Sequence, residues 1–147
     1  MIKWIALGIV LLVVAALAVM SFMTRETRVS DAPSPQLEPC PPSPNCVSSL
    51  APDGEHRVEP LSLIDGDPAA SWQRLLSVIE QHGGELVRRD AGYAHAVFTS
   101  ALFRFKDDLE VVLSSDHIDI RSASRAGRSD LGKNRQRVES IRQEYHQ

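Results

Sequence analysis

The sequence has few of the residues from which metal sites and nucleic-acid-binding surfaces are built. It contains only two cysteines, Cys40 and Cys46, and no second Cys or His pair at ligand spacing accompanies them, so no metal site is predicted. Aromatic residues make up only 5% of the 147 residues, and none stands among the arginines of the most basic segment. Together with the formal net charge of -3, this argues against a nucleic-acid partner.

The chain also lacks the residue patterns of a catalytic or cofactor-binding centre. The stretch from Gly127 to Gly132 superficially resembles a nucleophile elbow, but Leu131 stands where the second glycine belongs. No His–acid pair is placed to activate Ser129. The five histidines share no spacing, and we interpret His95 as a structural histidine. No catalytic residue and no cofactor are predicted, and a non-enzymatic protein is favoured.

A long apolar run is present near the N-terminus. It extends from Trp4 to Met23 with only two interruptions. About 20 apolar residues cross the core of a bilayer, so residues 1–23 are predicted to form a transmembrane anchor. The alternative is a signal peptide cleaved after Ala18, although the apolar run continues past that point. Nearly equal numbers of basic residues flank the run, so charge does not orient it in the membrane.

Residues 24–52 are rich in proline, serine and charge and show no hydrophobic period. This composition predicts a tether between the membrane and a folded domain. An even number of cysteines in a short exported chain favours a disulfide, so Cys40 and Cys46 are expected to close a small loop. The alternative is two unrelated thiols in a cytosolic domain. With a disulfide, the expected location is the bacterial inner membrane, with the folded domain in the periplasm or on another exported side.

Residues 53–147 are predicted to form one α+β domain. A helix begins with Asp67 as N-cap and Pro68 at its first position, carries an apolar stripe from Trp72 to Ile79, and ends at the Gly83-Gly84 pair. The final helix is expected to begin near Asp130 as N-cap, with an apolar stripe made of Leu131, Val138, Ile141 and Tyr145.

The remaining elements are strands. An edge strand is expected at 57–63, and further strands at 86–89, 93–99, 109–113 and 118–121, with residues 103–105 also alternating. The order β-α-β-β-β-β-α predicts a two-layer sandwich, in which an antiparallel sheet carries both helices on one face.

The alternation of apolar and polar residues predicts the register of the last two strands. If Leu113 faces Ile118, all the apolar residues of the two strands lie on one buried face, whereas a shift by one residue would expose half of them. The same register places Glu110 opposite Arg121 on the other face.

The segment 121–139 gathers six cations in a chain of net negative charge. Two glycines free its backbone, a helix N-terminus follows, and arginine suits bidentate contact with phosphate or carboxylate. These features predict an anion-binding loop. The alternative is that the arginines pair with acids of the fold and hold it together. The candidate ligand-binding residues are Arg121, Ser122, Ser124, Arg125, Gly127, Ser129, Asp130, Gly132, Asn134, Arg135 and Arg137, and the acidic partners are Asp107, Asp108 and Glu110.

Three motifs carry a family resemblance: CPPSPNCVSS at residues 40–49, FRFKDDLE at 103–110 and RSASRAGRSDLGKNRQRVE at 121–139. Together they resemble domain-of-unknown-function family fourteen ninety-nine, which occurs in bacteria and plastids and whose members are commonly exported or membrane-anchored. The resemblance covers about residues 38 to 146 and implies no particular activity. It implies that the three motifs converge in space, and we expect Asp108 or Glu110 to pair with Arg121 or Arg125.

The leading hypothesis is a non-enzymatic, membrane-tethered envelope domain. Its arginine-rich loop would bind an anionic small molecule, a lipid head group or an envelope protein. One alternative is a hydrolase or transferase that acts on an envelope substrate through Asp108, Glu110 and the loop arginines. Another alternative is a purely structural arginine network.

Overall fold

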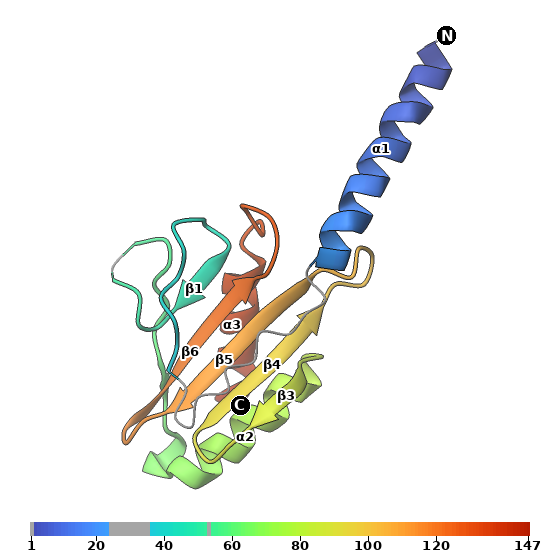
Figure 1. Ribbon diagram of the computed structural model, residues 1–147. Coiled ribbons are helices and arrows are strands. Elements are labelled where there is room, and N and C mark those ends of the chain that lie inside the picture. Colours follow the sequence, from blue (N-terminus) through green and yellow to red (C-terminus); the bar gives the residue numbers. More distant parts are fainter. Residues whose placement is uncertain (1, 24–35, 53) are drawn as a thin grey trace.

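The computed structural model describes residues 2–23, 36–52 and 54–147, so the first part of the predicted tether, residues 24–35, lies outside the described residues. Helix α1 (Ile2–Met23) extends away from the folded domain (Figure 1). Its segment Lys3–Phe22 has a mean hydropathy of 2.9 and is long and apolar enough to cross a bilayer. A helix of this kind serves either as a membrane anchor or as a signal sequence.

The folded part is built on one antiparallel sheet, with the strand order β1-β6-β5-β4-β3 and with β2 also paired to β6. The predicted meander is therefore confirmed, and the predicted edge strand is present in a shorter form as β2. The strands are β1 (Cys46–Ser48), β2 (Leu61–Ser62), β3 (Glu85–Arg89), β4 (Tyr93–Thr99), β5 (Lys106–Leu113) and β6 (His117–Ser124).

The predicted register of the β5–β6 hairpin is confirmed. Leu113 pairs with Ile118, and Glu110 pairs with Arg121. One face of the hairpin consequently carries the apolar side chains of the core, and the other carries charged side chains. The apolar face comprises Leu109, Val111, Leu113, Ile118 and Ile120.

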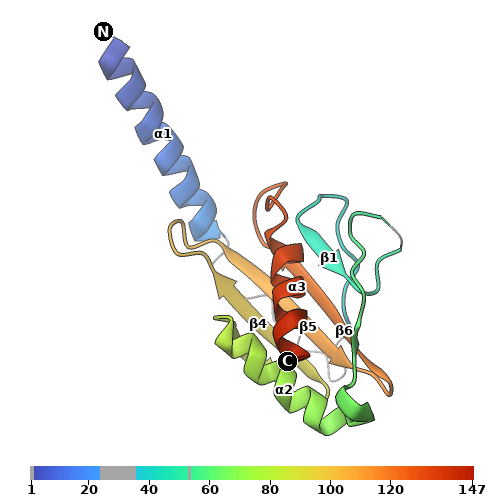
Figure 2. The same cartoon turned by 180° about the vertical axis from the view of Figure 1, so that it is seen from behind.

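Both helices of the domain, α2 (Pro68–Gln81) and α3 (Lys133–Tyr145), cover the apolar face of the sheet (Figure 2). A short 3-10 turn, η1 (Ile64–Gly66), precedes α2. Asp67 caps α2 as predicted, because its Oδ1 accepts hydrogen bonds from Ala69 N at 2.9 Å and Ala70 N at 3.0 Å. The fold is the α+β arrangement that the sequence predicts. Its core joins Trp72, Leu75, Leu76 and Ile79 of α2 to Val138, Ile141 and Tyr145 of α3.

Two local features differ from the sequence expectation. Residues 46–48, placed in the tether, form β1 on the edge of the sheet, where β6 would otherwise present unpaired backbone groups. Leu131, placed in the apolar stripe of the last helix, precedes that helix and is 89% exposed. The N-cap of α3 is Gly132, which adopts a left-handed conformation. Asp130 still satisfies the helix start, because its carboxylate accepts from Gly132 N at 3.0 Å and Asn134 N at 2.7 Å.

Candidate functional site

The acidic residues of β5 lie on both faces of the sheet, because successive side chains of a strand point in opposite directions. Asp107 contacts α3, whereas Asp108 contacts Arg125 on the other face. The two aspartates therefore diverge and do not form a shared carboxylate site. Within the described residues, no group of three or more His, Cys, Asp or Glu side chains is placed to hold a metal ion.

On the helix-covered face, Arg137 ties α3 to the sheet. Its Nη2 donates to Asp107 Oδ2 at 2.6 Å, and its Nη1 donates to Ser122 Oγ at 3.0 Å and to Asn134 Oδ1 at 2.5 Å. The guanidinium carbon lies 4.5 Å from the centroid of the Phe98 ring. The side chains of Arg137 and Asp107 are only 14% and 17% exposed. Such a buried charge pair is tolerated because both charges are paired and hydrogen-bonded.

On the opposite face, Asp108 is held from two sides. Arg125 donates from Nε to Oδ2 at 2.8 Å and from Nη2 to Oδ1 at 2.5 Å, and Nε2 of the buried His95 lies 2.7 Å from Oδ1. Burial by itself would raise the pKa of Asp108, but the hydrogen bonds from Arg125 and His95 outweigh it and hold that pKa below its usual value. A carboxylate of low pKa with both oxygens engaged is a poor general base, which disfavours an enzymatic role for Asp108.

Glu110 forms a second cluster beside it. Arg121 Nη1 donates to Glu110 Oε2 at 2.9 Å, and Tyr93 Oη donates to Glu110 Oε1 at 2.8 Å. Burial, together with the charge of Glu110, raises the pKa of Tyr93 well above its usual value, so the phenol remains a hydrogen-bond donor. The predicted pairing of Arg121 with Glu110 is confirmed, as is that of Arg125 with Asp108.

The cysteine loop joins this region through Asn45. Cys40 and Cys46 form the expected disulfide, with 5.6 Å between their Cα atoms. Asn45 Nδ2 donates to Gly127 O at 2.7 Å, and Asn45 O accepts from Asn134 Nδ2 at 3.0 Å. The three sequence motifs thus meet at one end of the sheet, as the resemblance implies.

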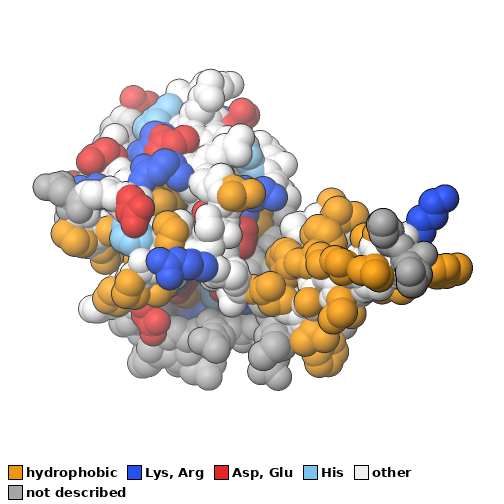
Figure 3. Space-filling view, turned by 90° about the horizontal axis from the view of Figure 1, so that it is seen from above, with side chains coloured by type: hydrophobic (Ala, Val, Ile, Leu, Met, Phe, Trp, Pro, Cys, Tyr) orange, Lys and Arg blue, Asp and Glu red, His pale blue; other side chains and the backbone are white. Residues whose placement is uncertain are grey.

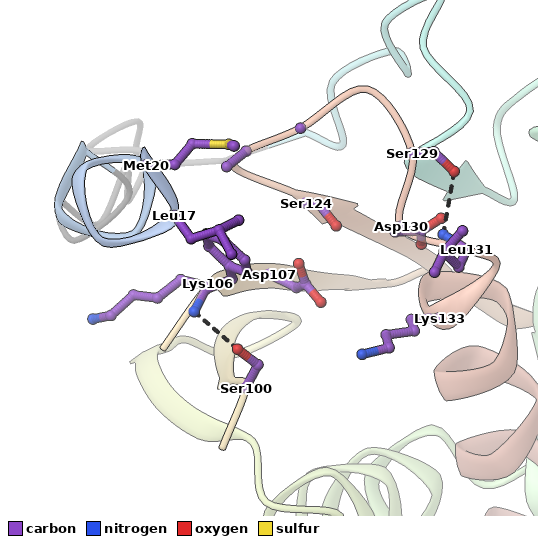
Figure 4. A pocket seen from close by; sticks show the side chains of 13 residues that line it. Leu17, Met20, Ser100, Lys106, Asp107, Ser124, Ser129, Asp130, Leu131 and Lys133 are labelled. Carbon is purple, nitrogen blue, oxygen red and sulfur yellow. Dashed lines mark hydrogen bonds between the residues drawn. The ribbon is translucent and has the colours of Figure 1, made fainter. Parts of the chain in front are cut away.

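A cavity of about 260 Å³ lies at this end, between α1 and the loop that connects β6 to α3. Figure 4 shows Leu17 and Met20 of α1 on one side of it and Ser129 and Lys133 on the other. The side of the cavity formed by α1 is thus apolar, whereas the domain contributes both polar and apolar side chains. Its remaining lining comes from Ser100, Phe105, Lys106, Asp107, Ser124, Ala126, Gly127, Asp130 and Leu131.

The acidic side chains that line this cavity have partners within the fold, whereas its lysines form no ion pair with the described residues. Its two acids are engaged, because Asp107 pairs with Arg137 and Asp130 caps α3. Lys106 and Lys133, by contrast, form no ion pair within residues 2–23, 36–52 and 54–147. With Arg137 counted against Asp107, the two lysines face one carboxylate, that of Asp130, and the cavity keeps an excess of positive charge.

The predicted ligand-binding residues fall into two groups. Members of the first group are bonded within the fold: Arg121, Ser122, Arg125, Asn134, Arg135 and Arg137. Members of the second group line the cavity: Ser124, Gly127, Ser129 and Asp130. Gly132 belongs to neither group and serves as the N-cap of α3.

Sequence reasoning missed Lys106 and Tyr93, and it counted Lys133 among the six cations without making it a candidate ligand-binding residue. Tyr93 shares a face of β4 with His95, and the period of two along that strand was the signal for it. The interpretation of His95 as a structural histidine agrees with its burial and its contact with Asp108.

A sequence model of the family described as "Protein of unknown function (DUF1499)" matches residues 36–145 of the chain. The match includes the cysteine loop, every strand of the sheet and α3. No curated protein and no solved structure matches the chain.

Proposed function

Since the chain belongs to the DUF1499 family of proteins of unknown function, we propose a function from its geometry: a membrane-anchored, non-enzymatic domain that binds the anionic head group of an amphiphile. The binding site is the cavity between α1 and the β6–α3 loop. The single observation that carries this proposal is the excess of positive charge, from Lys106 and Lys133, at a cavity with an apolar wall. A phosphate or carboxylate would contact Lys133, and the attached chain would lie along Leu17 and Met20. The side chain of Lys106 extends away from Lys133 in the structure (Figure 4), and it would rotate toward the anion on binding.

The hydroxyl groups of the cavity support the same ligand chemistry. Ser124 Oγ accepts a hydrogen bond from Asn134 Nδ2 at 2.9 Å, and Ser129 Oγ accepts one from Leu131 N at 3.2 Å. Neither hydroxyl donates within the described part of the chain, so each keeps its proton to donate to an anion. Ligand pockets usually measure about 300–1,000 Å³, so this smaller cavity suits a head group rather than a whole lipid.

The loop arginines have a supporting part in this proposal. Arg125 and Arg137 are engaged with carboxylates, so they position the walls of the cavity and do not themselves contact the anion. This assignment combines two of the sequence hypotheses, because the arginine network is structural and the binding function rests on the lysines beside it.

The location proposed for the domain is the exported side of a bacterial inner membrane, that is, the periplasm. The disulfide between Cys40 and Cys46 supports an oxidising compartment. The apolar helix α1 supports attachment to the membrane.

The proposal is tested by native mass spectrometry of the full chain extracted from membranes in a mild detergent. We expect an anionic amphiphile to co-purify with the wild type and to be lost from the K106Q/K133Q double variant. Each charge-assisted contact is worth about 1.5 kcal/mol or more, so loss of both predicts roughly 100-fold weaker binding.

The matched control is Arg89→Gln, which removes an exposed cation at the end of β3, beside the start of β4 and outside the lining of the cavity. It should retain the ligand. A folded wild type that carries no anion, or equal occupancy on the wild type and the K106Q/K133Q variant, would contradict the proposed function.

A further inference from the structure

The exposed hydrophobic side chains of the domain are unevenly distributed. Outside α1, the large hydrophobic side chains that are exposed among the described residues are Leu50, Leu102, Phe103 and Leu131. Single exposed apolar residues are ordinary on a protein surface, whereas a cluster marks an interaction site. Three of these four lie on two loops, with Leu102 and Phe103 between β4 and β5 and Leu131 between β6 and α3.

These two loops emerge side by side at the end of the sheet nearest α1. Asp107, at the start of β5, pairs with Ser124, at the end of β6, so the β4–β5 loop and the β6–α3 loop leave neighbouring strands at the same end. Figures 1 and 2 both show these loops beside the domain-proximal end of α1. The three apolar side chains therefore belong to the end of the domain from which the apolar helix departs.

Leu131 is placed there at a conformational cost. Its φ is 57°, a left-handed conformation that leucine rarely adopts, and its side chain is 89% exposed. The side chain therefore contributes almost no burial to the core of the domain. A leucine held in this way gains free energy only if something outside the domain covers it.

Cations surround the three apolar side chains. Arg104 and Arg128 are exposed on the same two loops, and Lys133 is exposed at the start of α3. The acids of this end, Asp107 and Asp130, are engaged by Arg137 and by the α3 N-terminus. Figure 3, which views the molecule from the end where α1 departs, shows Lys, Arg and hydrophobic side chains on the domain next to the apolar surface of α1.

The position of α1 beside these loops determines how deep they lie in a membrane that α1 spans. Leu17 and Met20 share the cavity with Leu131, so the β6–α3 loop lies alongside the last turns of the apolar helix. With a rise of 1.5 Å per residue, Leu17 and Met20 lie about 9 Å and 4.5 Å before the end of α1 at Met23. The 22 residues of α1 make a helix about 33 Å long, close to the core of a bilayer at about 30 Å, so when α1 spans a bilayer its end at Met23 lies near the boundary between head groups and acyl chains. The loops beside its last turns then lie at or just below that boundary.

We infer that this end of the domain docks on the surface of an anionic bilayer. Leu102, Phe103 and Leu131 insert at the head-group boundary, and Arg104 and Arg128 contact lipid phosphates. The surface holds the sheet close to the membrane instead of leaving it free on its tether. This docking goes beyond head-group binding in the cavity, because its contacts point outward from the loop tips and remain available when the cavity is empty.

The test measures the depth of single residues in lipid vesicles. Leu102, Leu131 and Leu50 are replaced one at a time by cysteine in the full chain, and each cysteine is nitroxide-labelled without reduction of the native disulfide. Leu50 is the matched control, because it is 57% exposed and follows β1, away from the two loops. The full chain is reconstituted in vesicles of phosphatidylcholine and phosphatidylglycerol, and the collision of each label with oxygen and with a water-soluble nickel complex is recorded.

We expect labels at 102 and 131 to be severalfold less accessible to the nickel complex, and more accessible to oxygen, than the label at 50. Arg104→Gln with Arg128→Gln should reduce this difference in anionic vesicles. Equal aqueous accessibility at all three positions would overturn the inference. Protection from the nickel complex at 102 and 131 without a gain in oxygen accessibility would also overturn it, because the cover would then be another protein surface. The Lys106→Gln variant should keep the protection, because Lys106 is not among the exposed cations of the two loops, so the test is independent of ligand binding in the cavity.

Discussion

Replacement of Arg137 by alanine separates an architectural arginine motif from a ligand-binding one. The substitution removes the hydrogen bonds to Asp107, Ser122 and Asn134 and the contact with the ring of Phe98. It also leaves the Asp107 carboxylate, only 17% exposed, without its counter-charge. Breaking a buried pair in this way costs about 3–5 kcal/mol, and the partial exposure of both side chains places R137A near the lower limit.

The expected loss is therefore about 3 kcal/mol, which for a domain of this size lowers Tm by roughly 12 °C or more. Thermal and urea unfolding of the full chain in mild detergent, followed by circular dichroism, measure it. Arg128→Ala is the matched control, because Arg128 is exposed in the same motif and forms no ion pair with the described residues; its effect should stay within about 0.5 kcal/mol.

A second substitution tests the physical cause of that loss. If the unpaired carboxylate dominates, the R137A/D107A double variant should be more stable than R137A alone, because no buried charge is then left without a partner. The reasoning is refuted if R137A unfolds at the wild-type midpoint, or if R128A costs as much as R137A.

Two further predictions concern Asp108 and the disulfide. Hydrogen bonds from Arg125 and His95 hold the pKa of Asp108 below its usual value despite burial. The stability that Asp108 contributes to the fold is therefore complete above about pH 4 and is lost as the pH falls through the lowered pKa. Urea midpoints recorded between pH 6 and pH 2.5 should fall steeply for the wild type and less steeply for D108N, and parallel curves would contradict this assignment. Replacement of Cys40 and Cys46 by serine should cost about 2 kcal/mol in unfolding free energy from the lost loop constraint, and an unchanged urea midpoint would exclude that contribution.

The hairpin of β5 and β6 could be predicted in detail because apolar and polar residues alternate along both strands, and only one register puts all the apolar residues on the same face. With Leu113 facing Ile118, every apolar residue of both strands falls on one face, and the Glu110–Arg121 pair follows from that register. Helix α2 was equally predictable, since Asp67 and Pro68 mark its start. In both cases local chemistry and tertiary packing favour the same structure.

The remaining parts depend on contacts between residues distant in the sequence. Three residues of β1 carry no usable period, and they form a strand because β6 offers a free edge. The position of His95 beside Asp108 depends on the β4–β5 register, which the loop at 100–105 leaves open in the sequence. The cavity needs α1 placed against the β6–α3 loop, and no local pattern encodes that placement.

The bond between Asn45 and Gly127 also constrains the order of folding. The two residues are 82 positions apart, and β1 can pair with β6 only after residues 117–124 have been synthesised. Contacts this distant in sequence form late and slowly, because the closure entropy of the intervening chain must be overcome first. While the chain emerges from the ribosome, β1 has no strand to join, so the domain stays open until β6 is available. A chain that ends before β6 would therefore leave β1 and the cysteine loop without their partner in the sheet.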